Sequence, residues 1–449
     1  MQFQTTPENY ARLYDTNRVY YKLYTANYTL PNFRYYINLY ASVWNATGYT
    51  FQSIATVRKR PLADGTCIFY PAEILQNYLT SSVVLEASGN TCAQNASIIF
   101  KIGVKEQYVV DRVITYSTEE FSTEKIGYNG VQEYLPYDII GGNLSWVMLT
   151  GTTLQGTGYY LTDMMYSYVD PVEHKWLYYI KPSGSTPLSV IYSIYYGDTP
   201  LYPSGNLTNY IQSAPGSLNS VSGNTPFDYE DLNWGGDVEI KPLFLTFNHP
   251  SYEWYVPAGP KQLSDMGMFN TGKTWVKYRV DMFSGVYKHN LYSTVFYRKE
   301  KCNKYRHFEL VWRNPHGGFD SHLFYLKNEL SYTIERLLYE KRLSHNYEIG
   351  DRGTTQYSGV VKENILLNSE WLTQNEYQLL TQLVMSPEVY MIYYYGVTRY
   401  NWTGQPITTE GYFVPMIITD TSIDYKYTDQ DKLIALSVNI TPSFTKNIR

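Results

Sequence analysis

Cysteine is scarce in this chain of 449 residues, which contains only three. Cys67, Cys92 and Cys302 are far apart in the sequence, and none belongs to a Cys-x-x-Cys pair. An odd number of widely spaced cysteines does not fit a disulfide framework or a cysteine-based zinc site. We therefore expect reduced cysteines that serve as packing residues.

Long hydrophobic runs and long basic runs are also lacking. No apolar segment approaches the roughly 20 residues that a membrane-spanning helix needs, and Met1-Gln2-Phe3-Gln4 begins no charged-then-apolar signal peptide. The longest Lys/Arg run is Arg58-Lys59-Arg60 in a chain of formal net charge -5, so no nucleic-acid-binding patch is visible. We expect a soluble protein made in the cytoplasm, with neither nucleic acid nor a membrane as its partner.

Strand signals recur along the whole chain, whereas helical signals are few. From Phe33 to Trp44 apolar residues occupy every second position, which is typical of a half-buried antiparallel strand. Similar strand patterns follow, separated by turns rich in Gly, Pro and Ser, and a short helix is expected after Pro71. Residues 323–339 fit both a helix and a strand, and we interpret them as a strand because Tyr332-Thr333-Ile334 prefers one. The sequence therefore predicts an all-β protein made of several β-sandwich-like domains.

The clearest helix signal covers residues 373–385. Thr373 and Glu376 have the spacing of a capping box, and Ser386-Pro387 ends the pattern. An apolar stripe at helical spacing consists of Tyr377, Leu380 and Val384, flanked by Leu379 and Leu383. This stripe predicts a single main helix packed on the sheet of the last domain, with Gln378 and Gln382 on its outer side.

The chain is longer than one hydrophobic core usually accommodates, so we expect more than one domain. The predicted parts are an N-terminal β-sandwich at residues 1–110, a second β-rich domain at 111–212, a linker at 213–236 and a C-terminal β domain at 237–449. The linker is predicted from Ser213–Asn224, which combines short side chains with Gly and Pro and has no periodicity.

Tyrosine is present in large excess, with 50 residues against 17 Phe and 9 Trp. Its ring is large and apolar while its hydroxyl is polar, so Tyr suits half-buried strand faces and protein interfaces. It also suits sugar-binding surfaces. We expect this aromatic surface to mark interfaces at which the chain associates with itself or with other proteins.

His316 and His322, with Asp320 between them, are the only histidines close enough in sequence to suggest a metal site. On one strand their side chains would point to the same face. The alternative is that Asn314-Pro315-His316-Gly317-Gly318 is an exposed turn between two strands. We adopt the turn and predict no bound metal.

The sequence contains one acidic segment and lacks the common catalytic motifs. Asp228, Glu230, Asp231 and Asp237 resemble a calcium loop in composition, but their spacing lacks the fixed Gly and final Glu of an EF-hand. We interpret this segment as a solvated loop. The sequence has no Gly-x-Ser-x-Gly elbow, phosphate-binding glycine loop, His-Glu-x-x-His or dinucleotide fingerprint. We therefore assign no catalytic, cofactor-binding or metal-binding residue and expect no enzymatic activity and no cofactor.

A series of short motifs occurs in a fixed order in two parts of the chain. Near the N-terminus they are Asn32-Phe33-Arg34-Tyr35 and Phe69-x-Pro71-Ala72-x-Ile74-Leu75-x-x-Tyr78-Leu79. Further on they are Cys302-x-Lys304-Tyr305, Glu309-Leu310-Val311-Trp312-Arg313-Asn314, His316-Gly317-Gly318-Phe319-Asp320, Phe324, Tyr357-Ser358, Asn368-Ser369-Glu370-Trp371-Leu372, Ser386-Pro387-x-Val389-Tyr390, Val414-Pro415-x-Ile417-Ile418 and Asp431-Lys432-Leu433. In this order they resemble a family of virion structural proteins of tailed bacteriophages, including crAss-like phages and other phages of Bacteroidetes and marine bacteria.

The resemblance covers about residues 30–80 and 300–440, and it implies a place in the virion. A β-sandwich with one helix laid on it looks like the tail-tube fold shared by tube, distal-tail and hub proteins, whose domains form rings. The resemblance thus implies a tail, baseplate or hub component, made in the host bacterial cytoplasm. Such a component forms a ring or connector with itself and with other virion proteins.

Two other functions remain open at this point. A host-binding fibre or capsid-decorating head-fibre protein would stack the same aromatic rings on host-surface glycans, which a glycan array would detect. An envelope polysaccharide hydrolase would need a cleft with two carboxylates whose pKa values are pushed apart. Hydrolysis of a host envelope extract would reveal that activity.

Overall fold

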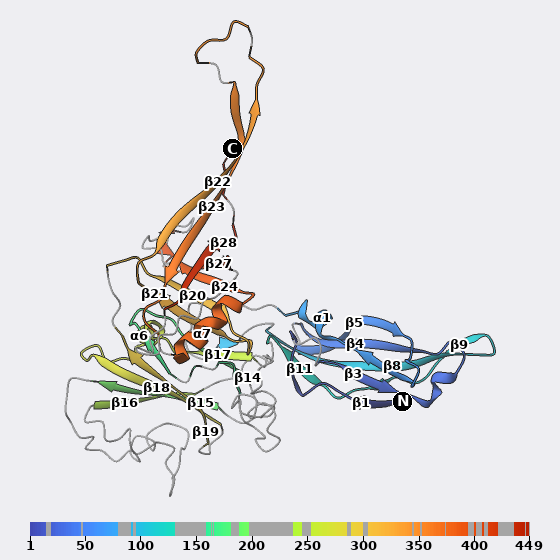
Figure 1. The fold of residues 1–449 in the computed structure, drawn as a ribbon. Coiled ribbons are helices and arrows are strands. Elements are labelled where there is room, and N and C mark those ends of the chain that lie inside the picture. Colours follow the sequence, from blue (N-terminus) through green and yellow to red (C-terminus); the bar gives the residue numbers. More distant parts are fainter. Residues whose placement is uncertain are drawn as a thin grey trace. The chain divides into compact units, whose positions relative to one another are not determined.

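The computed structural model of the chain describes residues 1–14, 19–45, 48–79, 91–92, 96–130, 159–162, 164, 166–180, 188–196, 237–244, 253–284, 289–299, 304–343, 345–350, 353–372, 374–393, 399–400, 406–407, 412–420, 435–444 and 446–448. They form two compact units. Unit 1 comprises Met1–Arg298 and Asn314–Phe319, and unit 2 comprises Lys299–Arg313 and Asp320–Arg449. Strands predominate in several sheets, with three α-helices among the described residues (Figure 1), which confirms the predicted all-β fold.

The first part of unit 1 is a β-sandwich with one short helix, as predicted. Its elements are β1 (Gln2–Thr5), β2 (Tyr10–Arg12), β3 (Tyr21–Tyr24), the 3-10 helix η1 (Ala26–Thr29), β4 (Arg34–Asn45), β5 (Gly48–Lys59), β6 (Thr66–Phe69), α1 (Ala72–Gln76), β8 (Ser97–Val110), β9 (Val113–Tyr116), β10 (Glu120–Phe121) and β11 (Lys125–Tyr128). One sheet has the order β1-β3-β6, and the other has the order β2-β11-β8-β4-β5, with β9 and β10 also paired to β8.

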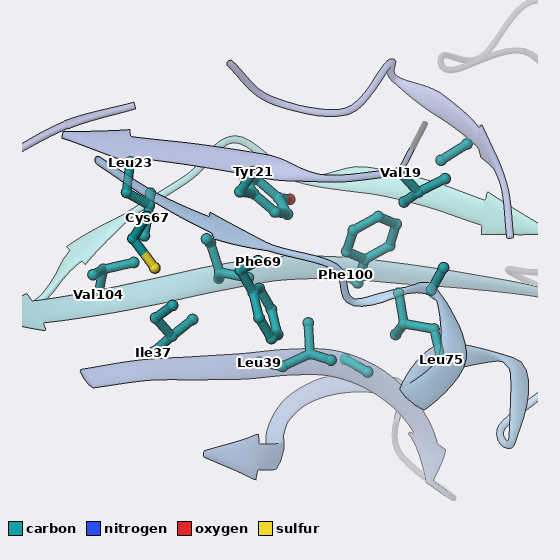
Figure 2. Packing of buried hydrophobic residues seen from close by; sticks show 14 of the residues in the cluster. Val19, Tyr21, Leu23, Ile37, Leu39, Cys67, Phe69, Leu75, Phe100 and Val104 are labelled. Atoms are coloured by element: carbon teal, nitrogen blue, oxygen red, sulfur yellow. The ribbon is translucent and has the colours of Figure 1, made fainter. Parts of the chain in front are cut away.

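The core of this sandwich lies between its two sheets (Figure 2). The alternation of β4 buries Tyr35, Ile37 and Leu39 completely, while β3 and β6 contribute Tyr21, Leu23, Cys67 and Phe69 from the facing sheet. Cys67 is a free, buried thiol, as expected of a packing residue. The period-2 pattern read from the sequence therefore identifies the inward face of β4 correctly.

Two more sheets complete unit 1. Their elements are β7 (Thr91–Cys92), β12 (Tyr159–Tyr160), β13 (Tyr166–Val169), β14 (Trp176–Ile180), β15 (Leu188–Tyr196), β16 (Asp237–Phe244), β17 (Glu253–Pro257), α6 (Pro260–Asp265), β18 (Trp275–Ser284) and β19 (His289–Arg298). The strand orders are β12-β14-β17-β7 and β13-β19-β18-β15-β16.

The grouping of these strands differs from the domain boundaries expected from the sequence. Residue 110 lies at a two-residue hairpin turn: Val110 pairs with Val113, and Asp111 and Arg112 both have positive φ, as a type I′ turn requires. The N-terminal sheet therefore continues to Tyr128. The strands within residues 237–298 pair with β7, β13, β14 and β15 rather than with the described C-terminal strands. The predicted linker at 213–236 lies outside the described residues.

Unit 2 is built on one eight-stranded sheet. Its elements are β20 (Phe308–Arg313), β21 (Phe319–Phe324), β22 (Glu329–Glu340), β23 (Thr354–Asn368), α7 (Gln374–Met385), β24 (Val389–Tyr393), β25 (Arg399–Tyr400), β26 (Pro406–Ile407), β27 (Tyr412–Ile418), β28 (Ser437–Pro442) and β29 (Lys446–Ile448). The sheet has the order β21-β20-β24-β27-β28-β23-β22, with β29 also paired to β23, and β25 and β26 form a separate ribbon.

Helix α7 packs on this sheet and ends before Ser386-Pro387, as predicted. The side chains of Tyr377, Leu380 and Leu383 are buried against the sheet residues Trp312, Leu367 and Val438, among others. Leu372, just before the helix, is buried in the same cluster as Tyr377, while the predicted cap Thr373 lies outside the described residues.

The outer side of α7 is less exposed than the sequence suggests. Gln382 was expected to face solvent, but it is only 8% exposed, so that expectation is wrong. Leu379 lies one turn before Gln382 and Leu383 lies next to it, and both pack on the core. The apolar face of the helix is therefore wide enough to cover position 382 as well.

Many tyrosines are core residues. Among the described residues, nine of the twelve largest fully buried side chains are Tyr21, Tyr35, Tyr128, Tyr178, Tyr179, Tyr192, Tyr196, Tyr255 and Tyr278. The hydroxyls of Tyr35, Tyr192 and Tyr278 donate to the carbonyl oxygens of Gly65, Pro257 and Ala258 at 2.6, 2.9 and 2.6 Å. Such bonds satisfy the polar tip inside the core, so much of the tyrosine excess serves packing rather than interfaces.

Candidate functional site

The histidines singled out from the sequence do not lie in an exposed turn. His316 is 6% exposed, Asp320 is 1% exposed, and the side chain of His322 is 12% exposed, so the expectation of exposure is wrong. His316 belongs to unit 1, whereas Asp320 and His322 belong to unit 2. Within the described part of the chain, no three His, Cys, Asp or Glu side chains are grouped so that they could hold a metal ion.

His316 lies in a tight turn between β20 and β21, which confirms the turn itself. The backbone N–H of Gly317 donates to the carbonyl of Asn314 at 3.0 Å, and the Asn314 side chain accepts from the N–H of His316. Gly317 has a φ of 99°, and a Cβ there would lie 1.6 Å from the carbonyl oxygen of Asn129. The turn is buried because unit 1 packs closely around its backbone.

His322 takes part in a buried ion-pair cluster of unit 2. Its Nε2 lies 3.6 Å from a carboxylate oxygen of Glu370, and the ammonium of Lys299 donates to the other oxygen. Burial alone would raise the pKa of Glu370, but His322 and Lys299 outweigh it and lower that pKa from 4.5 to about 2. Because each group has charged partners, we interpret the cluster as a structural contact between segments distant in sequence.

The acidic segment contributes little to the described structure. Asp228, Glu230 and Asp231 lie outside the described residues, and Asp237 is the first residue of β16, where it pairs with Tyr196. Three of the four residues of the predicted solvated loop thus lie outside the described part of the chain.

The most unusual surface of unit 2 is the β22–β23 hairpin, residues 329–366, which we call the arm. All twelve residues of β22 are exposed, and the arm runs beyond the other strands of its sheet (Figure 1). The interpretation of 323–339 as strand rather than helix is confirmed for residues 323–324 and 329–339, while residues 325–328 separate β21 from β22. An alternating strand normally buries one face. Here the exposed apolar residues include Leu330, Tyr332, Ile334, Leu337, Leu338 and Tyr339.

The two faces of the arm differ in chemistry along its inner half. Leu330, Tyr332 and Ile334 are paired with Ile365, Glu363 and Val361, so they share one face, which we call the apolar face. On the opposite face Lys362 pairs with Glu335 at 2.8 Å, and Asn364 donates to Thr333 at 3.1 Å. Hydrogen bonds and an ion pair satisfy the polar face, whereas the apolar face remains exposed to water.

A groove continues the apolar face toward the body of unit 2. It has a volume of about 580 Å³ and is lined by Arg306, Phe308, Leu330, Tyr332, Tyr393 and Phe444, among others. The Arg306 guanidinium lies 5.0 Å from the ring centre of Phe308 and 5.4 Å from that of Tyr393. Helix α7 covers the neighbouring part of the same sheet face, because Ile365 lines the groove and also belongs to the helix-covered core.

This candidate interface was only partly visible in the sequence. The alternation of Leu330, Tyr332 and Ile334 indicates a strand with one apolar face, but it cannot show that this face is exposed in the described structure. The groove combines residues from positions 306 to 444, which only the fold brings together.

The chain was compared with protein-family models and with curated proteins. No protein-family model matches it, and a search of curated proteins gives no significant match. In the part of the chain that the structure describes, none of the helices is long and apolar enough to cross a membrane.

Proposed function

We propose that this chain is a structural subunit of a bacteriophage virion, in the tail or baseplate, and that it assembles with itself and other virion proteins through its arm. The ordered motifs that resemble those of phage virion structural proteins support a location in the virion. The proposed role in assembly rests on the exposure of the arm.

The physical argument concerns the free energy of an isolated ribbon. A two-stranded hairpin is only marginally stable in water unless its apolar face is covered. Tyr332 and Leu338 are 54% and 57% exposed, and contiguous apolar surface of this kind marks binding sites in soluble proteins. A neighbouring subunit that covers the arm would remove this surface from water and fix the hairpin in one conformation.

The test compares two matched double variants. Tyr332→Ser/Leu338→Ser removes apolar surface from the arm, and Leu62→Ser/Tyr78→Ser removes the same two residue types from exposed positions in unit 1. We expect both variants to melt like the unmodified chain. Only the arm variant should fail to enter phage particles when tagged protein is supplied during an infection.

Two results would contradict the proposal. Electron micrographs of labelled particles that show no protein in the virion would refute the location. Equal incorporation of both variants would refute the role of the arm.

A further inference from the structure

Unit 2 offers one strand edge that is exposed along its entire length. The eight-stranded sheet ends in β21 on one side and β22 on the other. Five of the six residues of β21 are buried, whereas every residue of β22 is exposed. Among the described strands of this sheet, β22 is therefore the edge beside which an additional long strand can join.

The β22 edge lacks several of the features that usually prevent pairing, although Glu335 and Arg336 place charges near its middle. Its sequence contains no Pro and no Gly. The one irregularity in the ladder joins Leu337 to Ser358 and Leu338 to Gln356, so the extra residue is Tyr357 on β23 and β22 stays regular. Long, regular, apolar edge strands are templates for pairing with another chain.

The sequence of β22 is complementary to itself in one antiparallel register. We propose that a second copy of this chain pairs with β22 about a two-fold axis at Ile334, so that one sheet continues through both copies. This inference rests on the proposed role of the arm in assembly, and it names the partner and the register.

Most cross-strand neighbours in this register suit each other, and Ser331 opposite Leu337 is the exception. On the apolar face Ile334 meets Ile334, Tyr332 meets Arg336, and Leu330 meets Leu338 of the second copy. On the other face Thr333 meets Glu335. Apolar pairs and Tyr–Arg pairs stabilise antiparallel strands, and no like charges lie opposite each other.

Neighbouring registers are worse for identifiable reasons. An axis at Glu335 or Arg336 places two like charges directly opposite each other, which is destabilising. An axis at Thr333 shortens the ladder and leaves Leu338 and Tyr339 without a partner strand. If the two strands slip by one residue, so that Ile334 lies opposite Glu335 of the second copy, the apolar face of one copy lies on the same side of the sheet as the polar face of the other.

The same register also places the tip of the arm near the groove of the second copy. Glu340 lies opposite Asn328 of the second copy, and Asn328 lines the groove. The tip residues beyond Glu340 thus extend over the body of the second copy. They include Leu343, Tyr347 and Ile349, which are exposed in the single chain. Pairing of the edges would bring apolar tips to apolar grooves on both sides of the axis.

A charge exchange at the axis tests the proposal on the full chain. In Ile334→Lys or Ile334→Glu alone, two like charges face each other, and the dissociation constant of the dimer should rise by about tenfold or more. An equimolar mixture of the two variants should restore pairing. Leu62→Lys and Leu62→Glu, at a position 55% exposed in unit 1, are the matched controls and should leave association unchanged.

Cysteine cross-linking tests the register. Ile334→Cys should form an intermolecular disulfide on mild oxidation, because the two side chains meet at the axis. Tyr332→Cys should not, because its two copies are four residues apart, about 13 Å along the strand, beyond the reach of a disulfide.

Each other outcome overturns the inference. A chain that stays monomeric at the highest attainable concentration, a dimer that is indifferent to charge at position 334, or equal cross-linking of both cysteine variants would do so. Incorporation into particles is scored separately. Incorporation of Ile334→Lys into particles would contradict the two-fold pairing but not the proposed function. Chains that pair in solution but are absent from particles would contradict the proposed function but not the pairing.

Discussion

Replacing Leu380 by Asp should unfold unit 2. Leu380 is 1% exposed and packs with Leu383 of the same helix and with the sheet, so an aspartate there would be a charge buried among apolar groups. Losing the packing and burying an unpaired charge together should cost about 4 kcal/mol or more of unfolding free energy. Denaturant unfolding of the full chain, monitored by hydrogen exchange of the β20 and β24 amides, measures this loss.

The matched control is Met385→Asp in the last turn of the same helix. Met385 is 61% exposed, so the new carboxylate stays in water and costs only the repulsion from the C-terminal end of the helix, about 0.5 kcal/mol. Equal effects of the two substitutions would show that α7 does not bury the face assigned to it.

Glu370→Gln should produce the second large loss, and that loss should depend on pH. The carboxylate of Glu370 is paired with Lys299 and His322, and its pKa is lowered to about 2 against 4.5 in the unfolded chain. A lowered pKa means that the stabilisation is fully present above pH 4.5 and is lost as the pH falls toward 2. The difference in pKa corresponds to roughly 3 kcal/mol, which Glu370→Gln should remove at neutral pH.

The measurement is the free energy of unfolding of the unmodified chain and of Glu370→Gln at several pH values between 7 and 2. The curves should converge in acid, because protonation removes the same charge that the substitution removes. Glu329→Gln is the control, since its partner Lys327 is 66% exposed and a surface pair of this kind contributes little. Parallel curves would show that another group causes the acid sensitivity.

Local patterns made several parts of this fold predictable. Alternation identified the buried face of β4, and the spacing of Tyr377 and Leu380 identified helix α7 and the side on which it packs. Both signals depend only on residues close in sequence, whose side chains point the same way in a strand or helix. The burial of Gln382 was missed because the width of a contact depends on the surface that receives the helix.

Long-range pairing set the limit of prediction. Nothing local shows that β15 lies between β16 and β18, so residues 237–298 were grouped with the wrong neighbours in space. His316 and His322 are close in sequence, yet they belong to different units. The partners of Glu370 likewise come from positions 48 to 71 residues away in the chain, which sequence spacing cannot reveal.

The tyrosine core sets an alkaline limit on the fold. Burial raises the pKa of Tyr21 and of Tyr196 to about 12, and it raises those of Tyr35, Tyr192 and Tyr278 as well. Tyrosines in an unfolded chain ionise near pH 10, so the stability that these groups provide is complete below pH 10 and declines as the pH rises toward 12. These buried rings would form phenolate together when the core opens. The ultraviolet absorbance of phenolate during a base titration thus becomes an intrinsic optical record of cooperative unfolding.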